Sequence, residues 1–275
     1  MNKIKHIFLF ILVIFTVFAY SCEKKINSNN HKPIEKIFNY NYLERGLCVA
    51  KDNIVKFYWL DDDFSWIEAS LFEFIIPSDC KDVFSFWGRI GIITDTKIKF
   101  YKNIINEDLM GWDNKSYPWY EEQEMQFNLP ENFQTVFAIL FDIAVVADNK
   151  LNLYSFDEDI NEWKILPDTE FILPPNWQYI FGFDLDGFCI VTDNKMKIYW
   201  YSWFYNSWLE YYEMVFNLPE NYQDIFTNSQ GRFAPRKRYE AEAYEWISVM
   251  KDNILKFYYY PKNSWKEIEN IEFKK

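Results

Sequence analysis

The sequence predicts an all-β fold assembled from five copies of one four-stranded unit, and two spacings carry this prediction. In every copy a Tyr stands six residues after an Asp, and a Phe stands eight residues after a Trp. The Asp-Tyr pairs are Asp52-Tyr58, Asp95-Tyr101, Asp148-Tyr154, Asp193-Tyr199 and Asp252-Tyr258. The Trp-Phe pairs are Trp66-Phe74, Trp119-Phe127, Trp163-Phe171, Trp208-Phe216 and Trp265-Phe273. No stretch between these markers has the apolar period of a long helix.

Four antiparallel strands fit each copy. Strand A surrounds an aliphatic-Phe pair such as Ile37-Phe38, strand B precedes the Asp, strand C ends at the Tyr, and strand D begins at the Trp. In strand C apolar residues alternate with Lys or Asn, which is the period-two pattern of a strand. The Asp is followed by Asn or Thr, and Asp-Asn is typical of a tight hairpin turn because both residues tolerate positive φ.

The length of the repeat predicts how the copies assemble. The copies are spaced from 43 residues (Asp52 to Asp95) to 59 residues (Asp193 to Asp252), which is long enough for four short strands each. Such sheets need both faces covered, and radial closure covers them while protecting strand edges. We therefore predict a five-bladed β-propeller, with an open stack of the same hairpins as the alternative. The last copy ends after Phe273, and we expect Ile37-Phe38 to supply its missing strand A.

Some sequence runs resemble known propeller families. FNLPENFQTVF (127–137) and FNLPENYQDIF (216–226) resemble the junction between hemopexin-like blades, and LYSFDEDINEW (153–163) resembles the Tyr-to-Trp hairpin of kelch blades. The five-fold count resembles that of tachylectin-type sugar-binding propellers. The chain lacks the Ala pair of hemopexin-like blades, and its 7 Gly cannot supply the Gly pair of kelch blades. The resemblance covers residues 33–275 and implies a fold, not an activity.

The N-terminal segment predicts export. Residues 1–21, with Lys3 and Lys5 before an apolar run of 13 residues, resemble a bacterial lipoprotein signal peptide that ends at Ser21-Cys22. The run is shorter than the roughly 20 residues of a membrane-spanning helix, although an uncleaved anchor remains the alternative. This resemblance implies that Cys22 becomes a lipidated (palmitate-bearing) first residue. Residues 22–32 then form a polar tether, residues 33–275 form the propeller, and the expected location is the bacterial cell envelope, periplasmic or at the cell surface.

The net charge and the histidine content limit which partners and which kinds of site the chain could have. The formal net charge is -12 and becomes -14 when residues 1–21 are removed, which argues against nucleic acid and anionic headgroups as partners. The two histidines, His6 and His31, both precede the propeller domain, so a His-dependent triad or zinc site has no imidazole there. We expect no metal, cofactor or catalytic residue. We therefore predict a monomeric, non-catalytic binding module for a glycan or an envelope protein.

The three other cysteines are expected to pack in the core. Cys48 and Cys189 lie four residues before the Asp, where the other copies have small residues: Gly91, Ala144 and Ser248. Cys80 lies four residues before Phe84, where later copies have an aromatic residue. A Cys48–Cys189 disulfide would have to join non-adjacent blades, which is beyond the reach of that bond.

Loop carboxylates support an alternative function, an envelope enzyme that acts on glycans. The acids cluster at Asp61–Asp63, at Asp157–Asp159, and at Asp184 and Asp186. Glycoside hydrolysis needs two carboxyl groups roughly 5–10 Å apart. Alternating acids also suit calcium, although no full calcium-loop spacing is present. Clustered acids are otherwise a solvated surface.

The candidate ligand site is a repeated Asn-aromatic pair that follows the Pro between strands D and A. Its residues are Asn132-Phe133, Asn176-Trp177 and Asn221-Tyr222. An amide beside a ring suits a sugar, because the amide bonds hydroxyl groups and the ring stacks on the pyranose. The alternative is a buried plug with a turn-capping Asn, since Ile34 and Cys80 occupy the aromatic position in the other copies.

A second candidate surface consists of two long loops, which a propeller would place on the same face. One is a C–D loop that contains Trp112, and the other is an A–B loop with the basic residues Arg232, Arg236, Lys237 and Arg238. The basic loop suits an acidic partner, such as a sulfated glycan or an acidic protein patch. A solvated loop is the alternative.

Overall fold

The computed structural model describes residues 36–39, 46–60, 65–103, 118–139, 141–183, 187–227, 246–252, 254–260 and 264–274. These residues all lie in one compact unit, Ile34–Lys275. The predicted signal peptide (1–21), the lipidation site Cys22 and the tether (22–32) lie outside the described residues. Within the described ranges, no helix is both long and apolar enough to cross a membrane.

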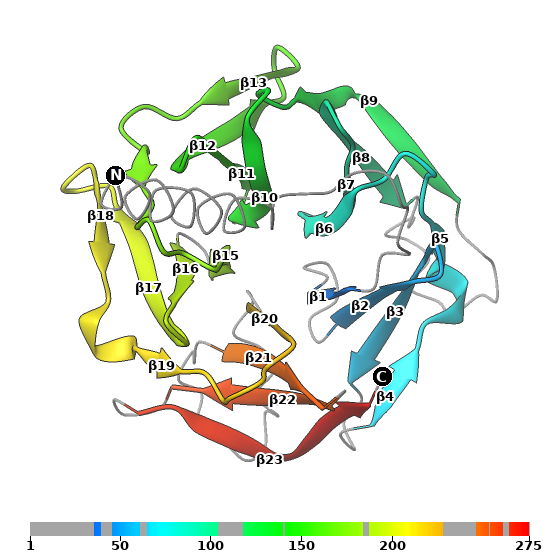
Figure 1. Cartoon of the computed structure of the whole chain (residues 1–275). Helices are drawn as coiled ribbons and strands as arrows, with labels where there is room; N and C mark the ends of the chain where they lie inside the picture. The colour runs from blue at the N-terminus through cyan, green and yellow to red at the C-terminus, as the bar shows by residue number, and fades with distance from the viewer. Residues whose placement is uncertain are drawn as a thin grey trace, which may run out of the picture. The chain divides into compact units, whose positions relative to one another are not determined.

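Five antiparallel sheets are arranged around a common centre, and each is made from one continuous stretch of chain (Figure 1). Blade I contains β1 (Lys36–Asn39), β2 (Gly46–Lys51), β3 (Ile54–Leu60), β4 (Trp66–Glu68) and β5 (Phe74–Ile75). Blade II contains β6 (Asp82–Phe86), β7 (Arg89–Ile93), β8 (Lys97–Asn103) and β9 (Trp119–Asn128). Blade III contains β10 (Phe133–Ile139), β11 (Asp142–Ala147), β12 (Lys150–Asp157), β13 (Glu162–Ile165) and β14 (Phe171–Ile172).

Blade IV contains β15 (Tyr179–Phe183), β16 (Gly187–Thr192), β17 (Lys195–Ser202), β18 (Ser207–Glu210) and β19 (Phe216–Asn217). Blade V contains β20 (Asp224–Thr227), β21 (Trp246–Lys251), β22 (Ile254–Tyr259) and β23 (Lys266–Lys274). The inner strands β1, β6, β10, β15 and β20 each contact the inner strands of both neighbouring blades, and β20 contacts β1. The ring is therefore closed, and the predicted five-bladed β-propeller is confirmed.

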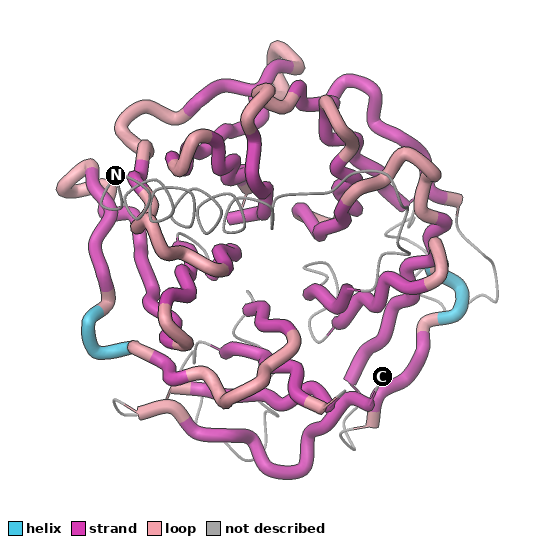
Figure 2. Tube along the Cα trace, viewed as in Figure 1, coloured by secondary structure: helices cyan, strands magenta, loops and turns pink. Residues whose placement is uncertain are grey.

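Strand D, the outermost strand of each blade, has two forms, and the sequence analysis did not distinguish them. In blades II and V strand D is continuous and shifts register partway along strand C. In blades I, III and IV it is interrupted, and short 3-10 helices fill the gap in blade I (η1, Ser70–Phe72) and blade IV (η3, Tyr212–Met214) (Figure 2). In both forms the repeated Phe pairs with an apolar residue of strand C, as Phe74 pairs with Val55 and Phe127 with Ile98. This shared pairing explains why the Trp-Phe spacing is constant.

The Asp-Asn pairs form the tight B–C turns that the sequence predicted. Asp148 and Asn149 have φ values of 51° and 61°, and Asp193 and Asn194 have 50° and 59°. Positive φ at both central residues matches the right-handed twist of the two strands. Blade II has Asp95-Thr96 instead, and neither residue has positive φ in that turn. There the Thr94 hydroxyl donates to the Lys97 carbonyl at 2.8 Å and closes the turn.

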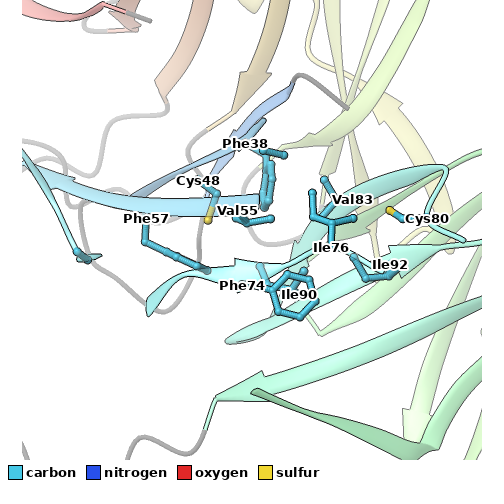
Figure 3. Packing of buried hydrophobic residues seen from close by; sticks show 12 residues of the cluster. Phe38, Cys48, Val55, Phe57, Phe74, Ile76, Cys80, Val83, Ile90 and Ile92 are labelled. Atoms are coloured by element: carbon cyan, nitrogen blue, oxygen red, sulfur yellow. The ribbon is translucent and has the colours of Figure 1, made fainter. Parts of the chain in front are cut away.

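The core consists of five apolar clusters, each lying between two neighbouring blades. Figure 3 shows the one between blades I and II, in which Phe38, Cys48 and Phe57 face Val83 and Ile92. The cluster that closes the ring joins Ile37, Leu47 and Val49 of blade I to residues of blade V: Phe226, Met250, Leu255 and Phe257. The expectation that Ile37-Phe38 completes the last copy is wrong, because β1 pairs with β2 in blade I and blade V has its own strand A, β20. Among the described strands none is shared between the two blades, and side-chain packing joins the first blade to the last.

The predicted core role of the cysteines is confirmed. Cys48, Cys80 and Cys189 are buried, and none forms a disulfide. Cys48 pairs across the sheet with Phe38 and Cys189 with Phe181, which explains the need for a small residue opposite each inner-strand Phe. Burial raises the pKa of the Cys80 thiol to about 12 and that of Cys48 well above its usual value. Both side chains are therefore packing groups rather than thiolate nucleophiles.

The repeated tyrosines predict a loss of stability at alkaline pH. Burial is the main cause of a raised pKa at all five of them: Tyr58, Tyr101, Tyr154, Tyr199 and Tyr258. Above about pH 10 the unfolded chain loses tyrosine protons that the folded chain still holds. The free energy of unfolding should therefore fall as pH rises above about 10, which urea titrations at about pH 9 and pH 11 would measure.

Tyr154→Phe is the matched control, because burial is the one cause that raises the pKa of Tyr154. This variant should lose less stability than the wild type between the two pH values. An equal loss in both proteins would mean that Tyr154 does not contribute to the alkaline transition.

Candidate functional site

The three Asn-aromatic pairs lie where the chain enters strand A of blades III, IV and V. At two of them the backbone N–H of the aromatic residue donates to the carbonyl of the preceding Pro, from Phe133 to Pro130 at 3.1 Å and from Trp177 to Pro174 at 3.2 Å. Cys80 repeats this turn with Pro77. The Pro thus starts a turn that sets the direction of the aromatic side chain.

Each aromatic ring of these pairs is half-buried, and each amide is exposed. Phe133 packs against the cluster between blades II and III, Trp177 against that between III and IV, and Tyr222 against that between IV and V. The three pairs therefore occupy three separate blade interfaces. In the described contacts, nothing brings one pair against another.

Polar contacts hold one of these pairs to its neighbours, and a ring contact holds another. The Trp177 indole donates to Asn149 Oδ1 at 3.4 Å, and the Asn176 amide donates to Asp193 Oδ2 at 3.0 Å. Tyr222 meets Tyr179 edge to face at 5.9 Å, and burial raises its pKa to about 12. Asn221 has a φ of 60°, which fits the turn role of an Asn. Each pair nevertheless combines an exposed Asn with a half-buried aromatic residue.

A second set of aromatic side chains, which the sequence analysis did not single out, lies at the opposite end of the blades. Antiparallel strands in the order A–D place the A–B and C–D connections at one end and the B–C and D–A connections at the other. The A–B turns carry Trp87 and Phe141, which are 48% and 49% exposed and meet edge to face at 5.1 Å. The C–D hairpin of blade IV carries Trp203, Phe204 and Tyr205, which are 59%, 86% and 66% exposed.

The signal for this second set was present in the repeat. Trp203, Phe204 and Tyr205 stand between Tyr199 and Trp208, at the positions that Glu158, Asp159 and Ile160 hold between Tyr154 and Trp163. A comparison of these two loops, position by position, would have revealed three aromatic residues where the preceding copy has two acids and an Ile.

A buried ion pair supports the A–B turn of blade II. The Arg89 guanidinium donates to both carboxylate oxygens of Glu122 and to the Trp87 carbonyl, the last at 3.3 Å. It also lies over the Trp87 ring, 5.3 Å from its centre. Arg89 and Glu122 are 7% and 8% exposed. Trp87 is thereby held in a left-handed backbone conformation (φ 40°) that large residues rarely adopt.

Of the remaining candidate residues, Asp157 forms an ion pair within its hairpin, and most of the others lie outside the described residues. Asp157 accepts a hydrogen bond from Lys164 at 2.6 Å, which is the main cause of its lowered pKa, and another from the Asp159 N–H. Trp112, Arg232, Arg236, Arg238, Asp61–Asp63, Asp184 and Asp186 lie outside the described residues. In the described part, no three His, Cys, Asp or Glu residues form a group that could hold a metal ion.

Comparisons with known proteins find only distant similarity. No family model matches the chain, and neither does any curated protein. Hsv2p of Kluyveromyces lactis shares 9% identity over 86% of this chain and 63% of its own, with a TM-score of 0.38. Hsv2 of Kluyveromyces marxianus shares 9% over 88% of this chain and 65% of its own, with a TM-score of 0.39. The chain spans less than two thirds of either protein, and no function is transferred from scores this low.

These comparisons do not support the resemblance to hemopexin-like and kelch blades, nor that to bacterial lipoproteins. The five-bladed architecture rests on the strand pairing of this chain itself.

Proposed function

We propose that the chain is an exported, lipid-anchored β-propeller that works in the bacterial cell envelope as a monomeric, non-catalytic binding module. Five exposed aromatic side chains at the A–B and C–D ends of blades II–IV are the observation that supports a binding role. Surfaces rich in exposed Trp, Tyr and Phe are typical of recognition sites, since these side chains dominate the binding energy of interfaces. Of the loop carboxylates considered for catalysis, Asp157 is paired with Lys164 in its own hairpin.

The anchoring part of this proposal predicts that Cys22→Ala abolishes labelling with radioactive palmitate and leaves an unprocessed precursor in a bacterial host. Cys80→Ala is the matched control, since Cys80 is a packing residue, and it should label like the wild type. Labelling of Cys22→Ala at the wild-type level would contradict lipid anchoring at that residue.

The binding part is tested in cells by placing a photo-crosslinking amino acid at Phe204 in one variant and at Trp177 in another. These positions sample opposite ends of the blades. A protein or glycan captured at either end supports the binding function, and no capture at either end contradicts it.

A glycan is the second candidate ligand, and the exposed amide beside a half-buried ring at Asn132-Phe133, Asn176-Trp177 and Asn221-Tyr222 favours it. A glycan array with the purified protein and with Trp177→Ala tests this. Sugar binding that Trp177→Ala removes would place a site at the D–A junctions. Binding that survives in the variant would place it elsewhere.

A further inference from the structure

An ion pair between blades I and II shows what one position of the inner strands can hold. Lys36 begins β1 and Asp82 begins β6. The Lys36 ammonium donates to both carboxylate oxygens of Asp82, at 2.8 and 2.9 Å. Asp82 Oδ1 also accepts the backbone N–H of Val83 at 2.8 Å, which fixes the carboxylate against its own strand. An ammonium carried by one blade is thus held by a carboxylate of the next blade.

The interface between blades IV and V has different residues at the same position. Tyr179 begins β15 and Asp224 begins β20. In both strands this residue pairs with the residue two before the repeated Asp, as it does in β1 and β6. Asp224 Oδ1 accepts the backbone N–H of Ile225 at 2.9 Å, so its carboxylate is fixed in the same way as that of Asp82. Tyr179 therefore occupies the position of Lys36, one blade before an equivalent carboxylate.

A second tyrosine lies beside this carboxylate. Tyr222 precedes Asp224 by two residues, as Cys80 precedes Asp82. Its ring meets that of Tyr179 edge to face at 5.9 Å, and the inner strands β15 and β20 contact each other (Figure 1). Burial raises the pKa of Tyr222 to about 12, and the nearby Tyr179 and Asp224 add to this effect. Tyr179 is 45% exposed, and the other two side chains are half-buried. Two accessible rings and a carboxylate therefore lie together at the D–A end of blades IV and V.

This combination suits an ammonium group that a ligand supplies. A carboxylate pairs with an ammonium, and the faces of aromatic rings attract it. The Lys36–Asp82 pair is an example within the chain itself. Asn221, next to Tyr222, is exposed, and its amide can bond the hydroxyl groups of a sugar. A sugar with a free amino group offers the ammonium, the hydroxyl groups and an apolar ring face together.

We propose that Asp224, Tyr179 and Tyr222 bind the ammonium of a sugar residue whose amino group is free. The amide of Asn221 bonds the hydroxyl groups of the same sugar. This inference rests on the glycan candidate of the proposed function, and it specifies the blade interface and the class of sugar.

The test measures binding of a fluorescein-labelled glucosamine oligomer to the purified full-length chain by fluorescence anisotropy. A mildly acidic buffer keeps the amino groups of the oligomer protonated. The comparison ligand is the same oligomer with every amino group acetylated, which removes the charge and keeps the sugar rings. The acetylated oligomer should bind about tenfold more weakly or worse. Equal affinity for the two oligomers would overturn the proposal.

Tyr179→Lys is the decisive variant. It places at the blade IV–V interface the residue type that Lys36 provides at the blade I–II interface, so its own ammonium should occupy the Asp224 carboxylate. We expect it to bind the glucosamine oligomer about tenfold more weakly or worse, with little change in stability because Tyr179 is 45% exposed. Asp224→Asn removes the charge and keeps an oxygen for the Ile225 N–H, and it should weaken binding to a similar extent.

Asp82→Asn is the matched control, because it changes the equivalent carboxylate, which already holds Lys36. It should bind the glucosamine oligomer like the wild type. An equal loss of binding in Asp82→Asn and Asp224→Asn would mean that negative charge in general attracts the oligomer, and it would overturn the site. Wild-type affinity in both Tyr179→Lys and Asp224→Asn would overturn it as well.

Three further outcomes separate this inference from the proposed function. Glycans without an amino group that bind through Trp177 would leave glycan binding standing and overturn this site. A labelled Lys-rich peptide that binds through Asp224, without any binding of the glucosamine oligomer, would assign the site to a protein partner and overturn the sugar. Photo-crosslinks from Phe204, with no binding of either oligomer, would leave the binding function standing and overturn this inference.

Discussion

Phe188→Ala is expected to lower the free energy of unfolding by about 3–5 kcal/mol, the usual cost of removing a buried Phe from a core. The Phe188 side chain is fully buried on β16, and its ring contacts those of Phe171, Tyr199 and Trp208. Phe171 comes from blade III, so the substitution opens a cavity in the interface between two blades. Urea unfolding followed by tryptophan fluorescence measures the change.

Phe204→Ala is the control for this experiment. The same ring is removed from a side chain that is 86% exposed, and the cost should stay within about 0.5 kcal/mol. Similar losses in the two variants would show that the hairpin of blade IV is part of the core and not a free surface.

The second large effect is expected at the buried ion pair. Glu122→Leu leaves the Arg89 guanidinium buried without its carboxylate and should cost about 3–5 kcal/mol. The double variant Arg89→Met/Glu122→Leu removes both charges and should recover most of that loss, because apolar replacements of a buried pair are often neutral. Urea unfolding of Glu122→Leu, of Arg89→Met and of the double variant gives the coupling energy between the two residues.

An exposed pair serves as the control for the ion pair. Lys150 and Glu170 lie 3.0 Å apart with half-exposed side chains, and Glu170→Gln should cost less than about 1 kcal/mol. If the double variant were as unstable as Glu122→Leu alone, the shape of this site and not its charge would be what stabilises blade II.

Most of the architecture could be predicted from the sequence, because the repeat keeps the residue types that turns, strand pairing and packing require. The pairing of the repeated Phe with strand C and the small residue opposite the inner-strand Phe each impose a constraint that recurs in every blade, and the Asp-Asn turn recurs in the sequence of every blade except blade II. The interruption of strand D could not be predicted from the sequence. The two parts of the interrupted strand both pair with strand C, so the Trp-Phe spacing is the same as in a continuous strand. The Arg89–Glu122 ion pair, which occurs in blade II, could not be predicted either. The position of Glu122 depends on the register shift between β8 and β9, which the sequence does not show.

The candidate site was less predictable than the fold. The Asn-aromatic pairs recur, which drew attention to them, and their half-buried rings are also part of the blade interfaces. The exposed loop Trp203–Tyr205 occurs in one described hairpin only, so repetition did not mark it. Residues outside a repeat carry no packing constraint, and their role depends on exposure, which one sequence does not reveal.

The closure of the ring has a consequence during protein synthesis. Ile37, Leu47 and Val49 are among the first residues of the domain to leave the ribosome, and Leu255 and Phe257, which cover them, are among the last. Among the described strands none is exchanged between these blades, so an apolar side of the first blade stays uncovered until the last blade has been synthesised. A chain truncated before the last blade would keep that side exposed, and such surfaces attract chaperones and promote aggregation. Synthesis of the last blade is therefore the step that covers this side of the first blade.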